Sequence, residues 1–197
     1  PATLDQAGIA RACVESVAEN TSDAVVAPLL WGAMAGVPGL LGYRAVNTLD
    51  AMIGHRSPRY AQFGWAAARL DDIANYLGAR VAGVLVVACA PLAGGSAAGA
   101  WRAWRRDAAA HPSPNAGVVE AAFAGALGVR LGGPTRYHHE LQIRPTLGDG
   151  AAPTVADLRR AVRLSRAVQA TAAGVAVAAA AVVERRLMPR KSRKPVT

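Results

Sequence analysis

Three long stretches of this sequence carry no charged residue, and they constrain the fold more than any other feature. These stretches comprise residues 24–43, 81–101 and 167–183. Each is close to the roughly 20 mostly apolar residues that a helix needs to cross a membrane. Arginines stand at their edges, where long cationic side chains can reach the interface. The stretches are rich in Ala and Gly, so buried helices of a soluble protein are the alternative; we adopt the membrane interpretation.

The net charge of +9 is distributed in a way that fits a membrane protein. The positive charge lies mostly in the segments between and after the uncharged stretches, as in the positive-inside bias of membrane proteins. No zinc finger, recognition helix or basic strand with interleaved aromatics accompanies it, so we expect no nucleic-acid partner. The basic tail, residues 184–197, is interpreted as a solvated topological anchor, with anionic lipid contact as the alternative.

Proline and glycine interrupt the first two uncharged stretches. Pro28 and residues 37–39 fall in the first, and Pro91 and residues 94–95 fall in the second. We therefore expect the first stretch to be kinked or re-entrant and the second to be broken.

Helical periodicity is clear in the segments beside the stretches. Leu70, Ile73, Ala74 and Leu77 share one arc of an amphipathic helix over residues 65–80 whose other side is densely polar. Another helix is expected to start at Thr154. Residues 111–117 cannot be helical, and residues 132–134 are expected to form a turn. No strand alternation is visible.

These patterns predict an all-α, multi-pass membrane protein with amphipathic helices and Pro/Gly-rich loops between the spans. We expect one membrane-embedded domain over residues 1–183, followed by the basic tail. Cys13 and Cys89 lie far apart in apolar surroundings and are expected to be buried, reduced thiols.

Polar residues gather in three short clusters beside the apolar stretches, at residues 18–23, 47–50 and 69–72. Carboxylates beside Asn and Thr oxygens suit a hard cation such as Mg²⁺, which commonly arrives with nucleotide phosphates. The competing interpretation is helix caps and solvated polar faces, with Arg69 and Asp72 as an ordinary helical ion pair. Ionisable residues next to membrane spans are costly, which favours a functional role.

Several motifs in a fixed order resemble one known family. They include AENTSD at 18–23, AVNTLDAMIGHR at 45–56, FGWAAARLDDIANYLGAR at 63–80, RRDAAAHPSPNAG at 105–117 and EAAFAGALGVRLGGP at 120–134. The series is similar to the adenosylcobinamide-phosphate synthase (cobinamide-phosphate synthase) family of cobalamin biosynthesis, from about residue 4 to residue 183. Members of that family are longer at the N-terminus, so the resemblance implies an N-terminally truncated member in the bacterial inner membrane.

The resemblance implies an amide-forming ligase that uses ATP and Mg²⁺. Its substrates would be adenosylcobyric acid and (R)-1-amino-2-propanol phosphate, or the free amino alcohol. Implied partners are these substrates, the lipid bilayer and other membrane enzymes of cobalamin assembly. The alternative is a non-catalytic regulatory or signalling membrane protein related to the same family.

The chemistry of such a reaction assigns candidate roles to residues in the matching motifs. Activating a carboxylate with ATP requires stabilisation of phosphoryl charge. The candidate ligands of Mg²⁺ are Glu19, Asp23, Asp50 and Asp72, and the candidate catalytic residues are His111, Asp71 and Asp72. The candidates for binding substrate or phosphate are Arg69, Arg80, Arg130, Asn47, Ser113 and Asn115.

One expectation about geometry follows, together with one difficulty. We expect Asp50 and Asp72 to face the same Mg-nucleotide site, because both lie in one short segment between apolar stretches. If the stretches 24–43 and 81–101 both crossed the membrane simply, however, Asp23 and His111 would lie on the side opposite to that segment. Either the proline-broken stretches re-enter, or the clusters have separate roles.

Overall fold

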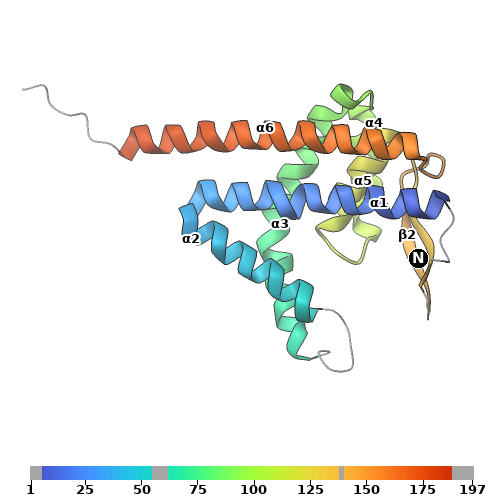
Figure 1. Ribbon diagram of the computed structural model, residues 1–197, viewed down its shortest axis with the longest axis horizontal. Coiled ribbons are helices and arrows are strands. Elements are labelled where there is room, and N and C mark those ends of the chain that lie inside the picture. Colours follow the sequence, from blue (N-terminus) through green and yellow to red (C-terminus); the bar gives the residue numbers. More distant parts are fainter. Residues whose placement is uncertain (1–5, 55–61, 138–139, 188–197) are drawn as a thin grey trace, which may run out of the picture.

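The computed structural model describes residues 6–54, 62–137 and 140–187, and within these ranges the fold is almost entirely helical (Figure 1). The expected all-α class is confirmed except for one two-stranded sheet. The helices and strands, with short π-helical and 3₁₀ segments written as η, are α1 Gln6–Asn20, η1 Thr21–Val26, α2 Ala27–Leu49, η2 Asp50–Gly54, α3 Phe63–Cys89, η3 Ala90–Ala93, α4 Ala97–Asp107, η4 Ala108–Ala110, α5 Ala116–Leu127, β1 Leu131–Tyr137, β2 Glu140–Leu147 and α6 Val155–Leu187.

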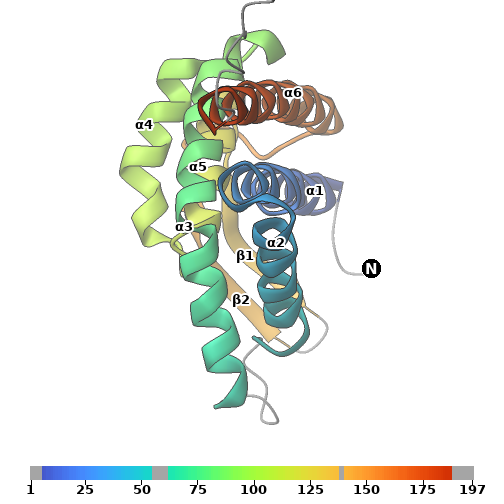
Figure 2. The same ribbon diagram turned by 90° about the vertical axis from the view of Figure 1, so that its left-hand side faces the viewer.

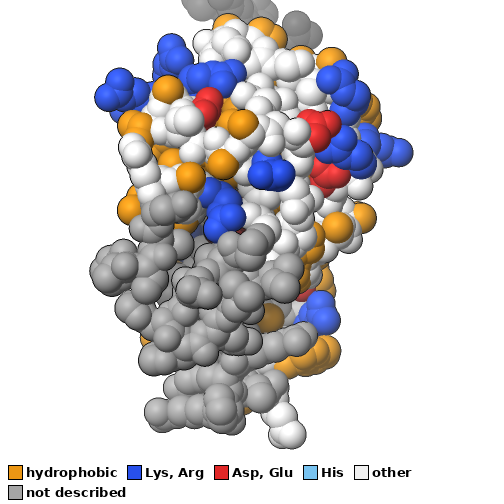
Figure 3. Space-filling model, turned by 90° about the vertical axis from the view of Figure 1, so that its right-hand side faces the viewer, with side chains coloured by type: hydrophobic (Ala, Val, Ile, Leu, Met, Phe, Trp, Pro, Cys, Tyr) orange, Lys and Arg blue, Asp and Glu red, His pale blue; other side chains and the backbone are white. Residues whose placement is uncertain are grey.

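The long helices do not form a parallel bundle. Helices α1 and α6 run side by side in the same direction, and α3 crosses both at a steep angle (Figures 1 and 2). Helix α6 continues past the rest of the molecule at its C-terminal end (Figure 1). At the opposite end, where α6 begins, blue basic side chains are prominent on the surface that is not grey (Figure 3).

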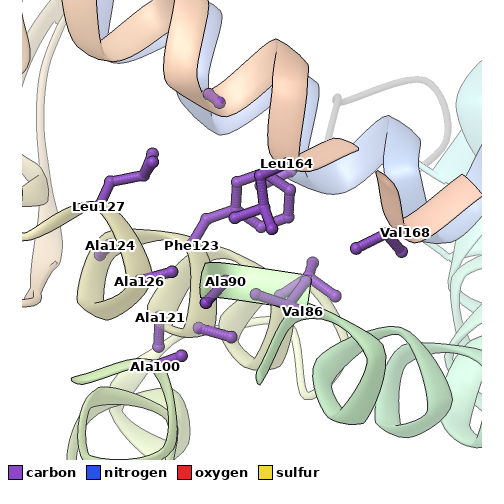
Figure 4. Packing of buried hydrophobic residues seen from close by; sticks show 14 of the residues in the cluster. Val86, Ala90, Ala100, Ala121, Phe123, Ala124, Ala126, Leu127, Leu164 and Val168 are labelled. Carbon is purple, nitrogen blue, oxygen red and sulfur yellow. The ribbon is translucent and has the colours of Figure 1, made fainter. Parts of the chain in front are cut away.

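Helix α5 forms the centre of the hydrophobic core. Its residues from Gly117 to Ala124 are all buried, and Phe123 contacts the layer formed by Val86, Leu164 and Val168 (Figure 4). Small residues let α4 approach α5 closely, because a Cβ on Gly125 would lie 2.2 Å from the backbone oxygen of Gly99. Both cysteines are free thiols and Cys89 is buried in this core, as expected, whereas Cys13 is only partly buried.

Three helical segments are long and apolar enough to cross a membrane, namely Gln6–Gly54, Phe63–Ala93 and Val155–Val182. The first contains the expected kink. Ala35 and Gly36 leave helical geometry just before Pro38, and the positive φ of 64° at Gly36 suits a residue without a Cβ. Pro28 causes no break, because it lies in the first turn of α2, where its missing N–H is not needed.

The boundaries expected for the second stretch are wrong. Residues 81–101 are not one helix: α3 ends at Cys89, and Gly94 reverses the chain with a φ of 66°. Helix α4 then starts behind Ser96, whose hydroxyl accepts a hydrogen bond from the Gly99 N–H at 2.9 Å. The break at Pro91 and residues 94–95 is therefore confirmed. The membrane-length helix instead joins the amphipathic segment 65–80 to the first part of the stretch.

The antiparallel strands β1 and β2 contradict the expectation of no strands and of a turn at residues 132–134. Strand β1 begins with glycines at positive φ, Gly132 at 70° and Gly133 at 82°, and the register shifts between Leu131 and Gly133. Such a bulge needs glycine rather than alternating apolar residues, so the segment lacks a strand pattern. His138 and His139, between the strands, and the last part of the basic tail, residues 188–197, lie outside the described residues.

Helix α3 has its apolar arc on the outside. The exposed fractions of Leu70, Ile73 and Leu77 are 52%, 73% and 51%, whereas Asn75 is only 1% exposed. The polar side of the helix faces α2 and the helix's apolar side is unpartnered among the described residues. This is the reverse of a helix at the surface of a water-soluble protein and fits an apolar surrounding.

Candidate functional site

A network of hydrogen bonds on the polar side of α3 is centred on the carboxylate of Asp71. Asn75 Nδ2 donates to Asp71 Oδ2 at 2.9 Å, and Asn47 Nδ2, near the end of α2, donates to Asp71 Oδ1 at 3.2 Å. The Tyr43 hydroxyl lies 2.7 Å from Asn75 Oδ1 and 2.8 Å from the backbone oxygen of Asp23. Two amides thus hold one carboxylate in place in a partly buried setting.

The kink in α2 makes this network possible. Beyond Gly36 the helix turns back along α3, so that Tyr43 and Asn47 lie against Asp71 and Asn75 (Figure 2). The π-helical segment η1 places Asp23 beside them, and Asp71, Glu19 and Asp50 are close enough to Asp23 to repel its carboxylate. The kinked stretch therefore brings together the clusters at 18–23, 47–50 and 69–72, which simple spans would have separated.

The network is better suited to a cation that arrives with water and substrate ligands than to a cation held by protein side chains alone. Among the described residues, no group of three or more His, Cys, Asp and Glu side chains could hold a metal ion. Mg²⁺ commonly takes one or two carboxylates and completes its shell with water and substrate phosphates. The carboxylate oxygens of Asp71 and Asp23 suit such an ion when a nucleotide carries it, whereas Asn47 Oδ1 accepts a hydrogen bond from Arg44 Nη1 at 3.1 Å.

Asp72 takes a different position from the one expected. Its carboxylate pairs with Arg69 Nη1 at 3.1 Å on an accessible part of the helix, and its backbone oxygen accepts a hydrogen bond from Asn115 Nδ2 at 2.8 Å. Successive residues on a helix point about 100° apart, so Asp71 and Asp72 cannot both face the α2 side. The structure brings Asp71, rather than Asp72, to Asn47.

The loop between η4 and α5 holds a second group of predicted residues. Arg80 Nη1 on α3 donates to Asn115 Oδ1 at 2.7 Å, and Asn115 is 5% exposed. Ser113 Oγ accepts hydrogen bonds from the N–H groups of Asn115 and Ala116 at 3.3 and 3.2 Å, which caps the start of α5. The two prolines keep residues 111–115 out of a helix, as expected, and the polar side chains fix this loop to α3. The expectation was wrong for residues 116–117, which form the first turn of α5.

His111 is nearly buried, and both of its ring nitrogens face protein groups. Nδ1 lies 3.0 Å from the Ser113 nitrogen and 3.1 Å from the Ser113 backbone oxygen, and Nε2 lies 3.8 Å from Glu120 Oε1. Burial lowers the pKa of His111, so the neutral ring is favoured. Because Nδ1 lies against the backbone of Ser113 and Nε2 faces Glu120, this arrangement suits a residue that positions the loop better than a proton acceptor.

Glu120 is a buried residue of the site that sequence reasoning missed. Its side chain is 1% exposed, and Oε1 has no hydrogen-bond partner among the described residues. Burial raises the pKa of Glu120 to about 9, with further contributions from Glu19 and Glu15. Glu15 also accepts the Gly132 N–H at 2.8 Å, which connects this acidic group to the start of β1. The signal was present, since Glu120 is the only charged residue between residues 116 and 129.

A pocket of about 400 Å³ opens beside this loop, between α3 and α4. The polar part of its lining is Arg80, Arg105 and His111, and the apolar part includes Trp104, Pro112 and Pro114. Arg80 also stacks over the Tyr76 ring at 3.5 Å. Among the described residues, no acidic side chain lines the pocket, so it is suited to an anion.

Two predicted arginines lie away from this pocket. Arg130 is exposed at the base of the hairpin, where its N–H donates to the backbone oxygen of Ala151. Arg69 is exposed and forms an ion pair with Asp72. Glu19 lies between the two groups of residues, because it interacts with Glu120 and with Asp23.

Comparisons with known proteins agree with the motif resemblance. The sequence profile of a family described as CobD/Cbib protein matches residues 1–165. A protein named "Cobalamin biosynthesis protein CobD" from Mycobacterium tuberculosis H37Rv is 76% identical over 177 residues, which cover 90% of this chain and 56% of the relative. Proteins of the same name from Rhodobacter capsulatus and Chromobacterium violaceum are 51% and 55% identical, covering 86% and 82% of this chain.

The matches also set the extent of the comparison. The chain spans about half the length of the curated relatives that it matches. No solved structure matches it.

Proposed function

The chain belongs to the CobD/Cbib family, and from this premise we propose that it takes part in cobalamin biosynthesis as an ATP-dependent, amide-forming enzyme of the membrane. The reaction would join adenosylcobyric acid to (R)-1-amino-2-propanol phosphate or to the free amino alcohol. The names of the relatives support a biosynthetic role and do not favour the regulatory alternative. Other membrane enzymes of cobalamin assembly are proposed as partners.

The observation that carries the proposal is the Asp71 carboxylate, which Asn47 and Asn75 fix beside Asp23. The pocket lined by Arg80 lies on another side of the same helix, α3. The two places are physically linked. Asn115 bonds to Arg80 through its oxygen and to the Asp72 backbone through its amide nitrogen. A rigid helix thus carries a carboxylate site and a cationic site a few turns apart.

This arrangement supports a division of roles. A carboxylic acid is a poor acyl donor, so transfer of the terminal phosphoryl group of ATP to it would first give an acyl phosphate and ADP. Attack by the amine would then form the amide and release phosphate and a proton. Mg²⁺ bound with ATP would neutralise part of the phosphoryl charge. Asp71, kept in one orientation by its two amide donors, would hold the cation together with Asp23 and Asp50. Arg80, held by Asn115, would bind an anionic group of a substrate.

His111 and Ser113 would act indirectly in this scheme. Their mutual hydrogen bond fixes the loop that presents Asn115 to Arg80. Deprotonation of the amine is then assigned to solvent or to the substrate itself, because both ring nitrogens of His111 lie against protein groups.

The test compares Asp71→Asn with Asp72→Asn in the protein expressed from its native gene. Product would be followed by mass spectrometry with adenosylcobyric acid, aminopropanol phosphate and ATP over a range of Mg²⁺ concentrations. We expect Asp71→Asn to lower the rate by about 10²-fold or more and to raise the Mg²⁺ midpoint. Asp72→Asn, which removes only an accessible ion pair, should cost less than about tenfold with an unchanged midpoint.

Two results would count against the proposal. Equal losses in the two variants would remove the special role of Asp71. An absence of amide product in the unaltered protein, with the protein folded and in its membrane, would contradict the activity itself.

A further inference from the structure

We propose that the pocket between α3, α4 and the loop at residues 111–115 binds the phosphate of the amine substrate, and that Arg105 selects the phosphorylated amino alcohol over the free one. The identity of the amine rests on the proposed function. The binding of a small phosphate monoester rests on the pocket alone.

The first argument is charge. Arg80 and Arg105 both line the pocket, and no Asp or Glu in the part of the chain that the structure describes does so. Arg105 has no ion pair among the described residues, and its nearest ring contact is a distant one, 5.8 Å from its guanidinium carbon to the Trp101 ring. A free ammonium group would meet only positive charge here, whereas a phosphate would meet two guanidinium groups.

The neighbouring Arg106 shows how an arginine without this role is used. It bonds Asp107 at 2.6 Å and Asp149 at 2.9 Å, and these hydrogen bonds hold the pKa of Asp107 and of Asp149 below the usual range. Its donors are therefore engaged in joining α4 to the turn after β2. Arg105, one residue earlier, lines the pocket, is exposed and forms no ion pair among the described residues.

The second argument is that Arg80 is already oriented. Arg80 uses the same nitrogen, Nη1, to donate to Asn115 Oδ1 and to the Tyr76 backbone oxygen. Stacking on Tyr76 fixes the plane of the guanidinium. The remaining N–H groups can therefore make a bidentate contact with phosphate oxygens at a small cost in side-chain entropy.

The third argument is size. At about 400 Å³ the pocket lies near the lower end of the roughly 300–1,000 Å³ range of ligand sites, so it suits a small molecule rather than a corrin ring. The Trp104 ring packs closely on Gly83 of α3 and forms one side of the pocket: a Cβ on Gly83 would lie 2.9 Å from this ring and 2.9 Å from Val118. Pro112 and Pro114 add stiffness on the opposite side.

The test is direct binding by calorimetry, in a phosphate-free detergent and without adenosylcobyric acid. The ligands are aminopropanol phosphate, aminopropanol and a non-hydrolysable ATP analogue. The variants are Arg105→Gln and the matched control Arg102→Gln, which removes the same charge from the same exposed helix one turn away and does not line the pocket. Thermal unfolding would confirm that both variants fold.

We expect aminopropanol phosphate to bind at least about tenfold more tightly than aminopropanol, and Arg105→Gln to weaken it by about tenfold or more. Arg102→Gln should change the affinity by less than about twofold. Equal affinity for the two amines, equal losses in the two variants, or tighter binding of the ATP analogue that depends on Arg105 would each overturn the proposal.

The two proposals fail in different ways. Phosphate-selective binding without amide formation would refute the proposed function and leave the pocket assignment intact. Amide formation from the phosphorylated amine that is unaffected by Arg105→Gln would refute the pocket assignment and leave the function intact.

Discussion

The buried carboxyl of Glu120 shows how much a single residue can constrain this site. An ionised carboxylate would be costly in that apolar position, so burial keeps a proton on it. A protonated Glu120 can stand beside Glu19 without repulsion and face the neutral ring of His111. We infer that its function is to hold His111, and through Ser113 the loop that carries Asn115, in one arrangement.

The pH dependence of unfolding tests this charge state. Between the unfolded pKa of 4.5 and the raised folded pKa, the folded protein binds one proton more than the unfolded chain, so the free energy of unfolding falls as pH rises. From about pH 7 to about pH 8.5 we expect a loss of up to about 1.4 kcal/mol per pH unit from this group. Glu120→Gln, which mimics the protonated form, should show a flatter profile by thermal or chemical unfolding.

The control for that measurement is Asp149→Asn. The Arg106 hydrogen bond lowers the pKa of Asp149, so its contribution to stability is complete above the unfolded pKa of 3.8 and disappears only in acid. Its profile from about pH 7 to about pH 8.5 should match the unaltered protein. If Glu120→Gln also matched it, Glu120 would be ionised at neutral pH and our account of His111 would be wrong.

Part of the site could be predicted at the scale of residues. The sequence placed Asn47, Arg80, His111 and Asn115 in matching motifs, and the structure brings these residues into two linked groups. It could not distinguish Asp71 from Asp72, because the choice depends on which side of α3 meets α2. Arg105 was missed because it stands among other arginines, and only the fold separates it from Arg106.

At the scale of elements, the contact between α2 and α3 decides whether the site exists. Trp31 Nε1 donates to the Ala74 backbone oxygen at 3.0 Å, and Gly78 lies directly against Ala27. A Cβ on Gly78 would be 2.6 Å from the Ala27 Cβ, so the helices can approach this closely only with glycine there.

We predict that Gly78→Ala separates the two helices and disturbs the Tyr43–Asn75–Asp71 network. Overpacking of this kind costs about 1–3 kcal/mol, and activity should fall by more than stability alone explains, because the network supports the carboxylate site. The matched control is Gly42→Ala on the exposed side of α2, where a Cβ would meet nothing within 4 Å. That variant should be neutral or slightly stabilising.

Unfolding midpoints and turnover of both variants, in the same detergent, provide the measurement. Similar midpoints and similar rates for the two would show that α2 and α3 tolerate separation and that the network does not depend on their contact.

The elements also show which sequence signals were reliable. The capping box at Thr154 is present, with the Thr154 N–H bonded to Asp157 Oδ2 at 3.0 Å and the Asp157 N–H to Thr154 Oγ1 at 3.4 Å. The breaks near Pro38 and at Gly94 were visible because backbone chemistry imposes them locally. The hairpin was not visible, because the glycines and the bulge near the start of β1 replace the apolar alternation that marks a strand.

At the scale of the whole molecule, many large apolar side chains lie exposed outside the apolar core, while several polar side chains are buried. Ile73 on α3 is 73% exposed and Val177 on α6 is 70% exposed, whereas Asn75, Glu120 and Ser165 are buried. In water such a surface would be unfavourable, and a hydrocarbon surrounding removes that cost. Three candidate spanning helices support the same conclusion, and their crossed arrangement means that topology must be measured helix by helix.

The last prediction addresses what surrounds the apolar arc of α3. In a background with Cys13 and Cys89 replaced by Ala, Ile73→Cys would be labelled with a charged maleimide in open membrane sheets, which expose both faces. Thiolate formation requires water, so a cysteine in lipid should react at least about tenfold more slowly than Arg102→Cys on the accessible face of α4. A short-chain detergent that admits water to the protein surface should restore the rate at which the maleimide labels Ile73→Cys. Equal labelling rates of the two cysteines in the membrane sheets would place the apolar arc in water and refute the membrane assignment of α3. Protection that persists in detergent would show that protein rather than lipid covers Ile73.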